Sequence, residues 1–151
     1  MIVDDEPNEI YMTKRVLSNT GFEVKVEAAM SGEVALELLQ NQETLPSLIF
    51  LDLKMPGTGG IDTLQRIRAD RHLRNIQVII MTNSLLELDK NASYSAGADG
   101  FLHKAFDMDL FGRDIKSLLE CWLKKQRRGQ RLNRNQPFPS CVCFFLCKHL
   151  C

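Results

Sequence analysis

The feature that most limits the fold of this chain is the regular alternation of short apolar runs with longer segments of helical period. Residues 48–51 are continuously apolar, as expected of a strand that is buried on both faces of a sheet. Similar runs recur before and after it, and a segment with helical spacing of its apolar residues follows each one. The five runs occupy residues 1–3, 22–29, 48–51, 78–81 and 100–103. This order predicts an α/β fold in which helices cover both faces of a parallel sheet.

Capping and turn residues predict where the helices begin and end. Pro7 suits the first turn of the first helix, which should stop at Gly21, and Ser31 can cap the second. Gly97 should end a helix at about residues 86–96, and Asp107 should cap the last helix. The expected apolar faces of the second, third and last helices comprise Val34, Ala35, Leu38 and Leu39; Ile61, Leu64 and Ile67; and Phe111, Ile115, Leu118, Leu119 and Trp122.

Charge is unevenly distributed along the 151 residues. Basic and acidic residues number 19 each, but all seven basic residues after Glu120 come without an acidic one, so residues 1–120 carry a net charge of −7. A body that binds nucleic acid needs a basic face to neutralise phosphates. We therefore expect no nucleic-acid partner for the folded part.

The apolar segments are too short to cross a bilayer, and the chain starts with a strand and an acidic cluster rather than with a signal peptide. We expect no membrane contact and a cytoplasmic location. Because all five cysteines lie after residue 120, we expect no disulfide framework in the body.

The C-terminal residues differ in composition from the body. We divide the chain into one domain over residues 1–125 and a basic, cysteine-rich tail over residues 126–151. The tail offers thiolates for zinc or sites for lipid attachment, but its cysteine spacing matches no metal finger well. We favour a disordered extension or an artefact. The cysteines of the tail are Cys141, Cys143, Cys147 and Cys151.

Polar residues stand at the carboxyl ends of four of the expected strands, where open α/β sheets bind their ligands. They are Asp4 and Asp5, Asp52, Thr82, and Lys104. Three neighbouring carboxylates would repel one another, and a divalent cation with oxygen ligands, Mg²⁺ above all, relieves that repulsion. Asp52 can then act as a nucleophile and form an aspartyl phosphate, while Lys104 and the Thr82 hydroxyl stabilise the phosphoryl oxygens.

The motifs Val3-Asp4-Asp5-Glu6 and Asp52-Leu53-Lys54-Met55-Pro56-Gly57, together with Thr82 and Phe101-x-x-Lys104, resemble the receiver domain of response regulators, the CheY-like family. The resemblance covers roughly residues 1–125. It implies a flavodoxin-like, doubly wound sheet of five parallel strands in the order 2-1-3-4-5, with five helices.

The same resemblance implies a role for each matching residue. Asp52 accepts a phosphoryl group, and Mg²⁺ is held by Asp5, Asp52 and the backbone carbonyl of Lys54, with Asp4 acting through water. Lys104 pairs with the phosphoryl group. Thr82 moves toward it, and the packing of Phe101 changes when Thr82 moves. Such a protein catalyses only its own phosphorylation and dephosphorylation, and is not otherwise an enzyme.

Three positions depart from the common receiver pattern. Ala105 follows Lys104 where proline is usual, Gly59 replaces a frequent aspartate, and Asn83 follows Thr82. Without the proline, the bond after Lys104 is either trans or a costly cis bond, and we expect looser placement of Lys104. Two further residues, Lys54 and Ser84, flank the route by which water would attack the phosphate and should tune its lifetime.

The resemblance also suggests partners. The long connection over residues 68–75 and the last helix look most like the single-domain regulators of phytochrome-type histidine kinases, so we expect such a kinase as partner. A homodimer through the fourth helix, fifth strand and fifth helix is expected as well.

Two alternatives remain open. A degenerate receiver could act as a binding module without phosphorylation. A phosphatase of the haloacid dehalogenase type also forms an aspartyl phosphate, but it needs a second aspartate where this chain has Lys54, so its general acid is missing.

Overall fold

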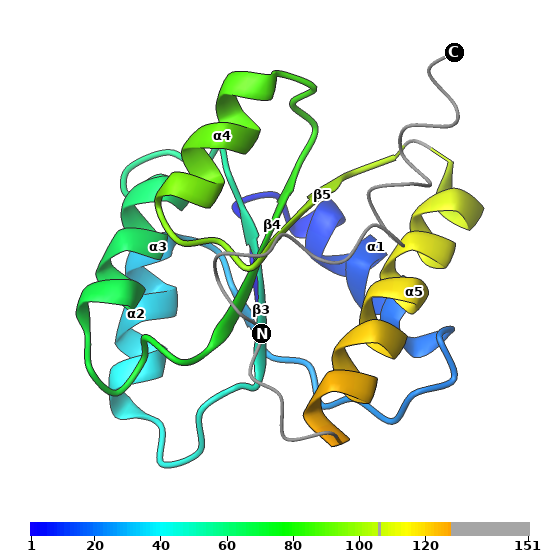
Figure 1. Cartoon of the computed structure of the whole chain (residues 1–151), viewed down its shortest axis with the longest axis horizontal. Helices are drawn as coiled ribbons and strands as arrows, with labels where there is room; N and C mark the ends of the chain where they lie inside the picture. Colours follow the sequence, from blue (N-terminus) through cyan, green and yellow to red (C-terminus); the bar gives the residue numbers. More distant parts are fainter. Residues whose placement is uncertain (106, 128–151) are drawn as a thin grey trace.

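The structure, a computed structural model, describes residues 1–105 and 107–127. Five parallel strands form one sheet in the order β2-β1-β3-β4-β5, as expected from the sequence (Figure 1). The strands are β1 (Ile2–Val3), β2 (Ala28–Ala29), β3 (Leu48–Asp52), β4 (Gln77–Thr82) and β5 (Gly100–His103).

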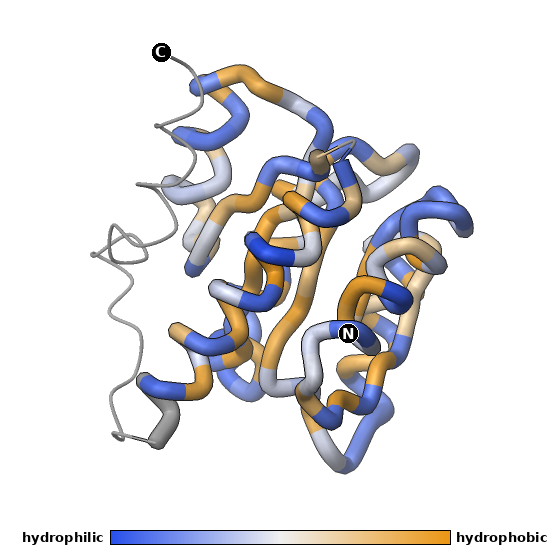
Figure 2. The backbone as a smooth tube through the Cα atoms, turned by 90° about the vertical axis from the view of Figure 1, so that its right-hand side faces the viewer, coloured by the Kyte–Doolittle hydropathy of each residue, from blue (hydrophilic) through white to orange (hydrophobic). Residues whose placement is uncertain are grey.

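Five helices cover the two faces of the sheet. In Figure 1, α2, α3 and α4 lie on one side of the strands, and α1 and α5 lie on the other. The helices are α1 (Pro7–Ser18), α2 (Gly32–Asn41), α3 (Gly60–Ala69), α4 (Glu87–Ser95) and α5 (Met108–Arg127). Figure 2 shows hydrophobic and hydrophilic residues alternating along the helices, as expected for elements with one buried face.

Two apolar cores result, one on each face. The side chains of Leu51 and Ile80 join the core under α2 and α3, whereas those of Phe50 and Ile79 join the core under α1 and α5. The alternation follows from the two-residue period of a strand. Because β3 is buried on both faces, its sequence is apolar at every position before Asp52.

The second strand is much shorter than residues 22–29, so that prediction was wrong in extent. Only Ala28 and Ala29 pair with β1, because β1 itself has two residues to pair with. The amide groups of Ile2 and Asp4 donate to the carbonyls of Glu27 and Ala29 and end the ladder there. Residues 22–27 follow an irregular path instead.

Helix boundaries and faces agree with the sequence apart from two details. The Ser31 hydroxyl accepts a hydrogen bond from the Val34 amide at 3.2 Å, and Asp107 accepts from the amide groups of residues 109 and 110. However, α1 ends at Ser18, and a turn leads from there to Gly21, whose φ is +81°. Val34 is 43% exposed, because it lies beside the cap rather than on the buried face of α2.

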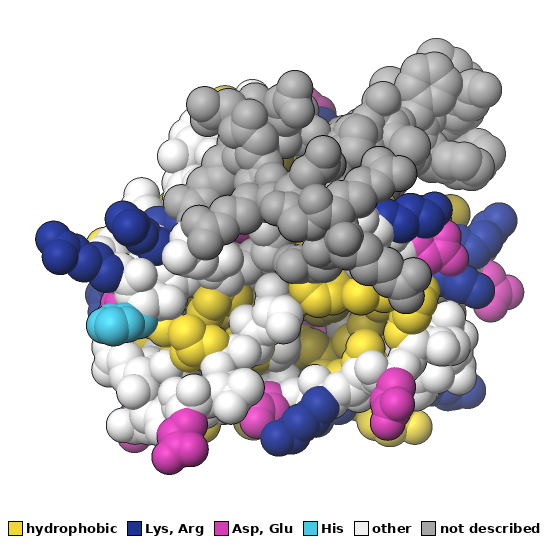
Figure 3. Space-filling model, turned by 60° about the horizontal axis from the view of Figure 1, so that its bottom comes forward, with side chains coloured by type: hydrophobic (Ala, Val, Ile, Leu, Met, Phe, Trp, Pro, Cys, Tyr) yellow, Lys and Arg dark blue, Asp and Glu magenta, His cyan; other side chains and the backbone are white. Residues whose placement is uncertain are grey.

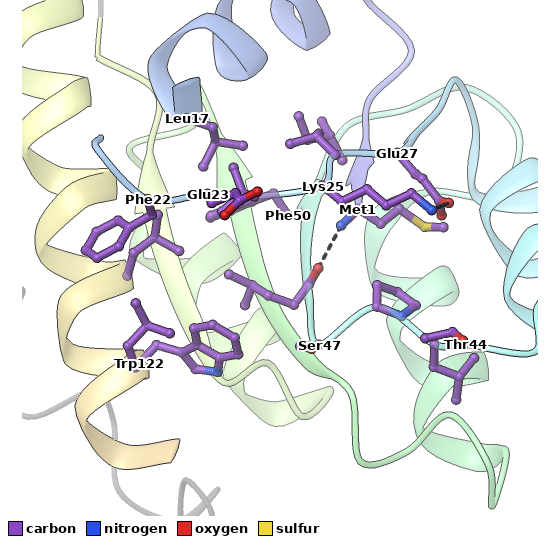
Figure 4. Close-up of a pocket in the computed structure, with 18 residues that line it drawn as sticks. Met1, Leu17, Phe22, Glu23, Lys25, Glu27, Thr44, Ser47, Phe50 and Trp122 are labelled. Carbon is purple, nitrogen blue, oxygen red and sulfur yellow. Dashed lines mark hydrogen bonds and ion pairs between the residues drawn. The ribbon is translucent and has the colours of Figure 1, made fainter. Parts of the chain in front are cut away.

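A mainly apolar hollow of about 520 Å³ lies at the edge where the strands begin. Figure 3 shows hydrophobic side chains gathered on this face, and Figure 4 shows Leu17, Phe22, Phe50 and Trp122 among the side chains that line the hollow. The hollow is therefore at the opposite edge of the sheet from the polar residues at the strand ends.

No helix in the described part of the chain is long and apolar enough to cross a membrane. The division at residue 125 falls inside α5, which continues to Arg127. The four cysteines of the tail lie outside the described residues.

Candidate functional site

Four strands bring their polar residues together at one edge of the sheet. Asp4 directly follows β1, Asp52 and Thr82 are the last residues of β3 and β4, and Lys104 directly follows β5. All four are buried: Asp4 and Thr82 are 1% exposed, and Asp52 and Lys104 are 6% exposed. Polar groups are buried at such cost only when they have partners, so the contacts among them decide what the site can do.

Lys104 lies between two of the carboxylates. Its Nζ donates to Asp4 Oδ2 at 2.6 Å, lies 2.8 Å from Asp52 Oδ1 and lies 3.9 Å from Glu9 Oε2. Burial alone would lower the pKa of Lys104, but its hydrogen bonds to Asp4 and Asp52 outweigh burial and raise the pKa above 10.5. The lysine is therefore a cation at neutral pH, and it lies directly beside Asp52.

The bond from Lys104 to Ala105 is trans, since the described residues contain no cis peptide bond. The backbone amide of Lys104 donates a hydrogen bond to the Thr82 carbonyl at 2.9 Å. The lysine is thus held at both ends, by β4 through its amide and by two carboxylates through its ammonium.

Asp52 is positioned by the loop that follows it. Its Oδ2 accepts a hydrogen bond from the Lys54 amide at 2.7 Å. Gly60, the first residue of α3, packs so closely that an added Cβ would lie 2.2 Å from the Asp52 carbonyl oxygen. Only glycine lets α3 begin against the end of β3 in this way.

The two neighbouring aspartates, Asp4 and Asp5, differ in burial. Asp4 Oδ1 accepts from the Glu6 amide at 3.0 Å, whereas Asp5 is half-buried. Burial raises the pKa of Asp4, and the hydrogen bond from Lys104 only partly opposes it. Asp4 is therefore a carboxylate whose charge depends on the neighbouring ammonium.

The oxygen donors fit the chemistry of Mg²⁺, which prefers carboxylates, carbonyls and water. Asp5, Asp52 and the Lys54 carbonyl supply such oxygens. Within the described residues, no three His, Cys, Asp or Glu side chains are arranged to hold a metal by themselves. In the expected set only two carboxylates would contact the metal directly, and a backbone carbonyl and water would complete the coordination. Metal binding therefore stays a prediction.

The Thr82 hydroxyl is held by the loop that leads to α4. Its Oγ1 accepts a hydrogen bond from the Ser84 amide at 3.1 Å. Phe101, on the neighbouring strand β5, is half-buried and packs against the core under α2 and α3. The two proposed switch residues therefore lie on adjacent, paired strands.

Sequence reasoning missed two groups that support the site. Glu33 accepts a hydrogen bond from the Thr58 amide at 2.8 Å, which ties α2 to the loop after Asp52, and hydrogen bonding from Thr58 lowers the pKa of Glu33 to about 2. Asp89 of α4 contacts both Lys54 and Ser84. No local pattern marks either residue, because each partner comes from another element.

The fold and this constellation define a class of protein, the phosphoacceptor domains of two-component signalling. The sequence model of the response regulator receiver domain matches residues 1–116. The chain belongs to this family.

Relatives with known names agree with that assignment. Response regulator Rre1 of Synechocystis sp. is 32% identical over 79% of this chain and 50% of its own length. The transcriptional regulatory protein CpxR of Escherichia coli is 35% identical over 85% of this chain and 53% of its own length. The chain thus spans about half the length of these two relatives.

Solved structures include phytochrome-associated regulators, as expected from the sequence. The phosphorylated cyanobacterial phytochrome response regulator RcpA has a TM-score of 0.74 at 26% identity, covering 81% of this chain and 91% of that chain. The bacteriophytochrome response regulator AtBRR has a TM-score of 0.65 at 30% identity, covering 76% and 87%. The receiver fold is consistent with signalling rather than catalysis on other substrates.

Proposed function

We propose that Asp52 accepts a phosphoryl group from a sensor histidine kinase and thereby switches the contacts of this domain with other proteins. The observation that carries the proposal is the position of Asp52, at the end of β3 and 2.8 Å from the Lys104 ammonium. An anionic nucleophile beside a buried cation is the arrangement that transfer of a phosphoryl group requires.

In the transfer step, a carboxylate oxygen of Asp52 attacks phosphorus, and the bond from phosphorus to the donor nitrogen breaks. The Lys104 ammonium can then pair with the negatively charged phosphoryl oxygens, because it already lies against Asp52. The Thr82 hydroxyl, at the end of the neighbouring strand, can donate to one of those oxygens once it moves toward them. When bound by Asp5, Asp52 and the Lys54 carbonyl, with Asp4 reached through water, Mg²⁺ would neutralise phosphoryl charge.

The output surface that we propose comprises α4, β5 and α5. Three leucines around the N-terminus of α4 support it: Leu85 and Leu86, just before the helix, and Leu88, in its first turn, are 77%, 59% and 79% exposed. Exposed apolar side chains grouped in this way mark contact sites between proteins. A change in Thr82 and Phe101 would reach this surface directly, through the loop that precedes α4 and through β5.

The partner that we propose is a phytochrome-type histidine kinase, with a homodimer through the α4, β5 and α5 surface as the output. Similarity to RcpA and AtBRR supports the kinase class. Partnership with such a kinase would place the protein in the cytoplasm. Transfer of phosphate from a phytochrome-type kinase, compared with an unrelated kinase, tests this part, and light scattering of the parent and Leu88→Ser tests the dimer.

Incubation with acetyl phosphate and Mg²⁺, followed by intact mass, tests the central claim. The parent should gain the mass of one phosphoryl group, and Asp52→Asn should not. Asp62→Asn is the matched control, because Asp62 pairs with Arg66 on the surface of α3 and should leave the gain unchanged. An unchanged parent mass would contradict the proposal and favour a binding module that works without phosphorylation. Steady hydrolysis of phosphate esters would instead favour the phosphatase alternative.

A further inference from the structure

Asp89, in the first turn of α4, joins two residues that lie beside the phosphoacceptor. Its Oδ2 accepts a hydrogen bond from the Ser84 hydroxyl and lies 3.7 Å from Lys54 Nζ. Lys54 comes from the loop after β3, and Ser84 comes from the loop after β4. One carboxylate on α4 therefore connects the loops that follow both Asp52 and Thr82.

Each of these loops is also tied to the site by its backbone. The Lys54 amide donates to Asp52 Oδ2 at 2.7 Å, and the Ser84 amide donates to Thr82 Oγ1 at 3.1 Å. A continuous path of contacts thus runs from Asp52 through Lys54, Asp89 and Ser84 to Thr82. Asp89 is the only residue of this path that lies on a helix, and removing its carboxylate would interrupt the path.

We propose that Asp89 is a positioning residue that sets the lifetime of the phosphorylated state by holding the Lys54 ammonium and the Ser84 hydroxyl away from the phosphoryl group. The inference rests on the proposed function, since it concerns the aspartyl phosphate at Asp52. It adds a residue of α4, the helix of the proposed output surface, to the control of dephosphorylation.

Competition for Lys54 gives the direction of the effect. A phosphoryl group on Asp52 adds negative charge two residues from Lys54, whose side chain is 65% exposed. The Asp89 side chain, 26% exposed, is the competing anion. While Asp89 holds Lys54, water has an open approach to phosphorus; once released, the ammonium pairs with the phosphoryl oxygens and covers that approach.

The step at issue is hydrolysis. A water oxygen forms a bond to phosphorus, the bond between phosphorus and the Asp52 carboxylate oxygen breaks, and the products are the free carboxylate and inorganic phosphate, with a proton released to solvent. A cation seated over the phosphoryl oxygens leaves this water less room to attack.

Two variants separate the two contacts of Asp89. Asp89→Asn loses the charge that holds Lys54 but keeps an oxygen that can accept from Ser84, whereas Asp89→Ala loses both. Glu87→Gln is the matched control. Glu87 is also an acid in the first turn of α4, but its partner is Lys90, at 3.5 Å, so it tests helix stability without touching the path.

The first measurement is the decay of phosphorylated protein after acetyl phosphate is removed. We expect Asp89→Asn to lengthen the lifetime roughly two- to fivefold, the range that an exposed ion pair supports, and Glu87→Gln to leave it unchanged. The effect should shrink at high salt, which screens the pair. In a Lys54→Ala background, Asp89→Asn should have no further effect. An unchanged or shorter lifetime in Asp89→Asn, or an equal change in that background, would overturn the proposal.

The second measurement needs no phosphorylation. Hydrogen exchange of the Ser84 amide should become about threefold faster in Asp89→Ala, because the Ser84 hydroxyl loses the acceptor of its proton and keeps only the hydrogen bond from the Leu86 amide, and should stay at the parent rate in Asp89→Asn. Equal rates in all variants would overturn the positioning role. If this pattern appears but the parent never gains a phosphoryl group, the failure belongs to the proposed function and not to the positioning by Asp89.

Discussion

The ammonium of Lys104 lies 2.6 Å from a carboxylate oxygen of Asp4, although the two residues are 100 positions apart in the chain. Both side chains are almost fully buried, and Lys104 also contacts Asp52. Burial of one carboxylate without a counterion would be unfavourable, and burial of two would be worse. The unphosphorylated site is therefore held together by this lysine.

Lys104→Met should destabilise the protein by about 3 kcal/mol in buffer without Mg²⁺, because it leaves Asp4 and Asp52 buried without their cation. Added Mg²⁺ should restore more stability to the variant than to the parent, since the metal then supplies the missing positive charge. Urea unfolding with and without Mg²⁺ measures both effects. Lys116→Met, an exposed change on α5, is the control. Equal responses of parent and Lys104→Met to Mg²⁺ would contradict the expected metal site.

The pH dependence of stability should reveal the buried charge of Asp4. Its pKa in the folded protein is raised above 3.8, so between these pKa values the folded state binds more protons than the unfolded state. The contribution of Asp4 to stability therefore falls as the pH rises from 3.8 through the folded pKa. The pKa of Lys104 is also raised, so its contribution to stability is complete below 10.5 and is lost as the pH rises through the folded pKa.

Asp4→Asn isolates the first of these effects. The stability of the variant relative to the parent should increase as the pH rises above 3.8 and should then level off. Urea unfolding of both proteins over this range gives the difference, from which the other carboxylates cancel. A difference that does not vary with pH would show that Asp4 has the same pKa in the folded and unfolded states.

Much of the site could be predicted because each of its residues follows a local pattern. Asp52 comes after a run of four apolar residues, and a run of that kind is buried on both faces of a parallel sheet. Thr82 and Lys104 likewise follow the runs that became β4 and β5. Since parallel strands end at the same edge, the order of elements was enough to bring these side chains together.

The contacts that could not be predicted depend on where elements meet. The extent of β2 was wrong because strand length depends on the partner, and β1 has only two residues to pair. Val34 was misplaced because a residue next to a helix cap can have helical spacing and still face solvent. The contacts of Glu33 and Asp89 join elements whose sequences carry no mark of each other.

A second buried ion pair, between Arg68 and Asp99, should matter for stability and not for phosphorylation. Arg68 Nη2 lies 2.8 Å from Asp99 Oδ2, and the guanidinium also donates to the carbonyls of Gly97 and Ile76. The two side chains are 10% and 3% exposed.

Arg68→Met should cost about 3 kcal/mol, because Asp99 stays buried without its cation. Arg66→Met is the control: its partner Asp62 is half exposed, so the cost should be at most about 1 kcal/mol. Urea unfolding compares the two variants. A similar cost for both would mean that burial of the Arg68 pair contributes nothing.

Two glycines test how strictly Asp52 is positioned. An added Cβ at Gly60 would lie 2.2 Å from the Asp52 carbonyl oxygen and 2.8 Å from Leu53 Cα, and both are backbone atoms that move only with the strand end. Gly60→Ala should therefore destabilise the protein by about 2 kcal/mol and slow phosphorylation by acetyl phosphate, because Asp52 is displaced.

At Gly112, in α5, the nearest atom would be a Val16 methyl carbon at 3.9 Å, an ordinary contact. Gly112→Ala should raise stability by up to about 1 kcal/mol, since alanine favours helix, and leave phosphorylation unchanged. Normal phosphorylation of a folded Gly60→Ala protein would show that the carboxylate does not depend on the close approach of α3.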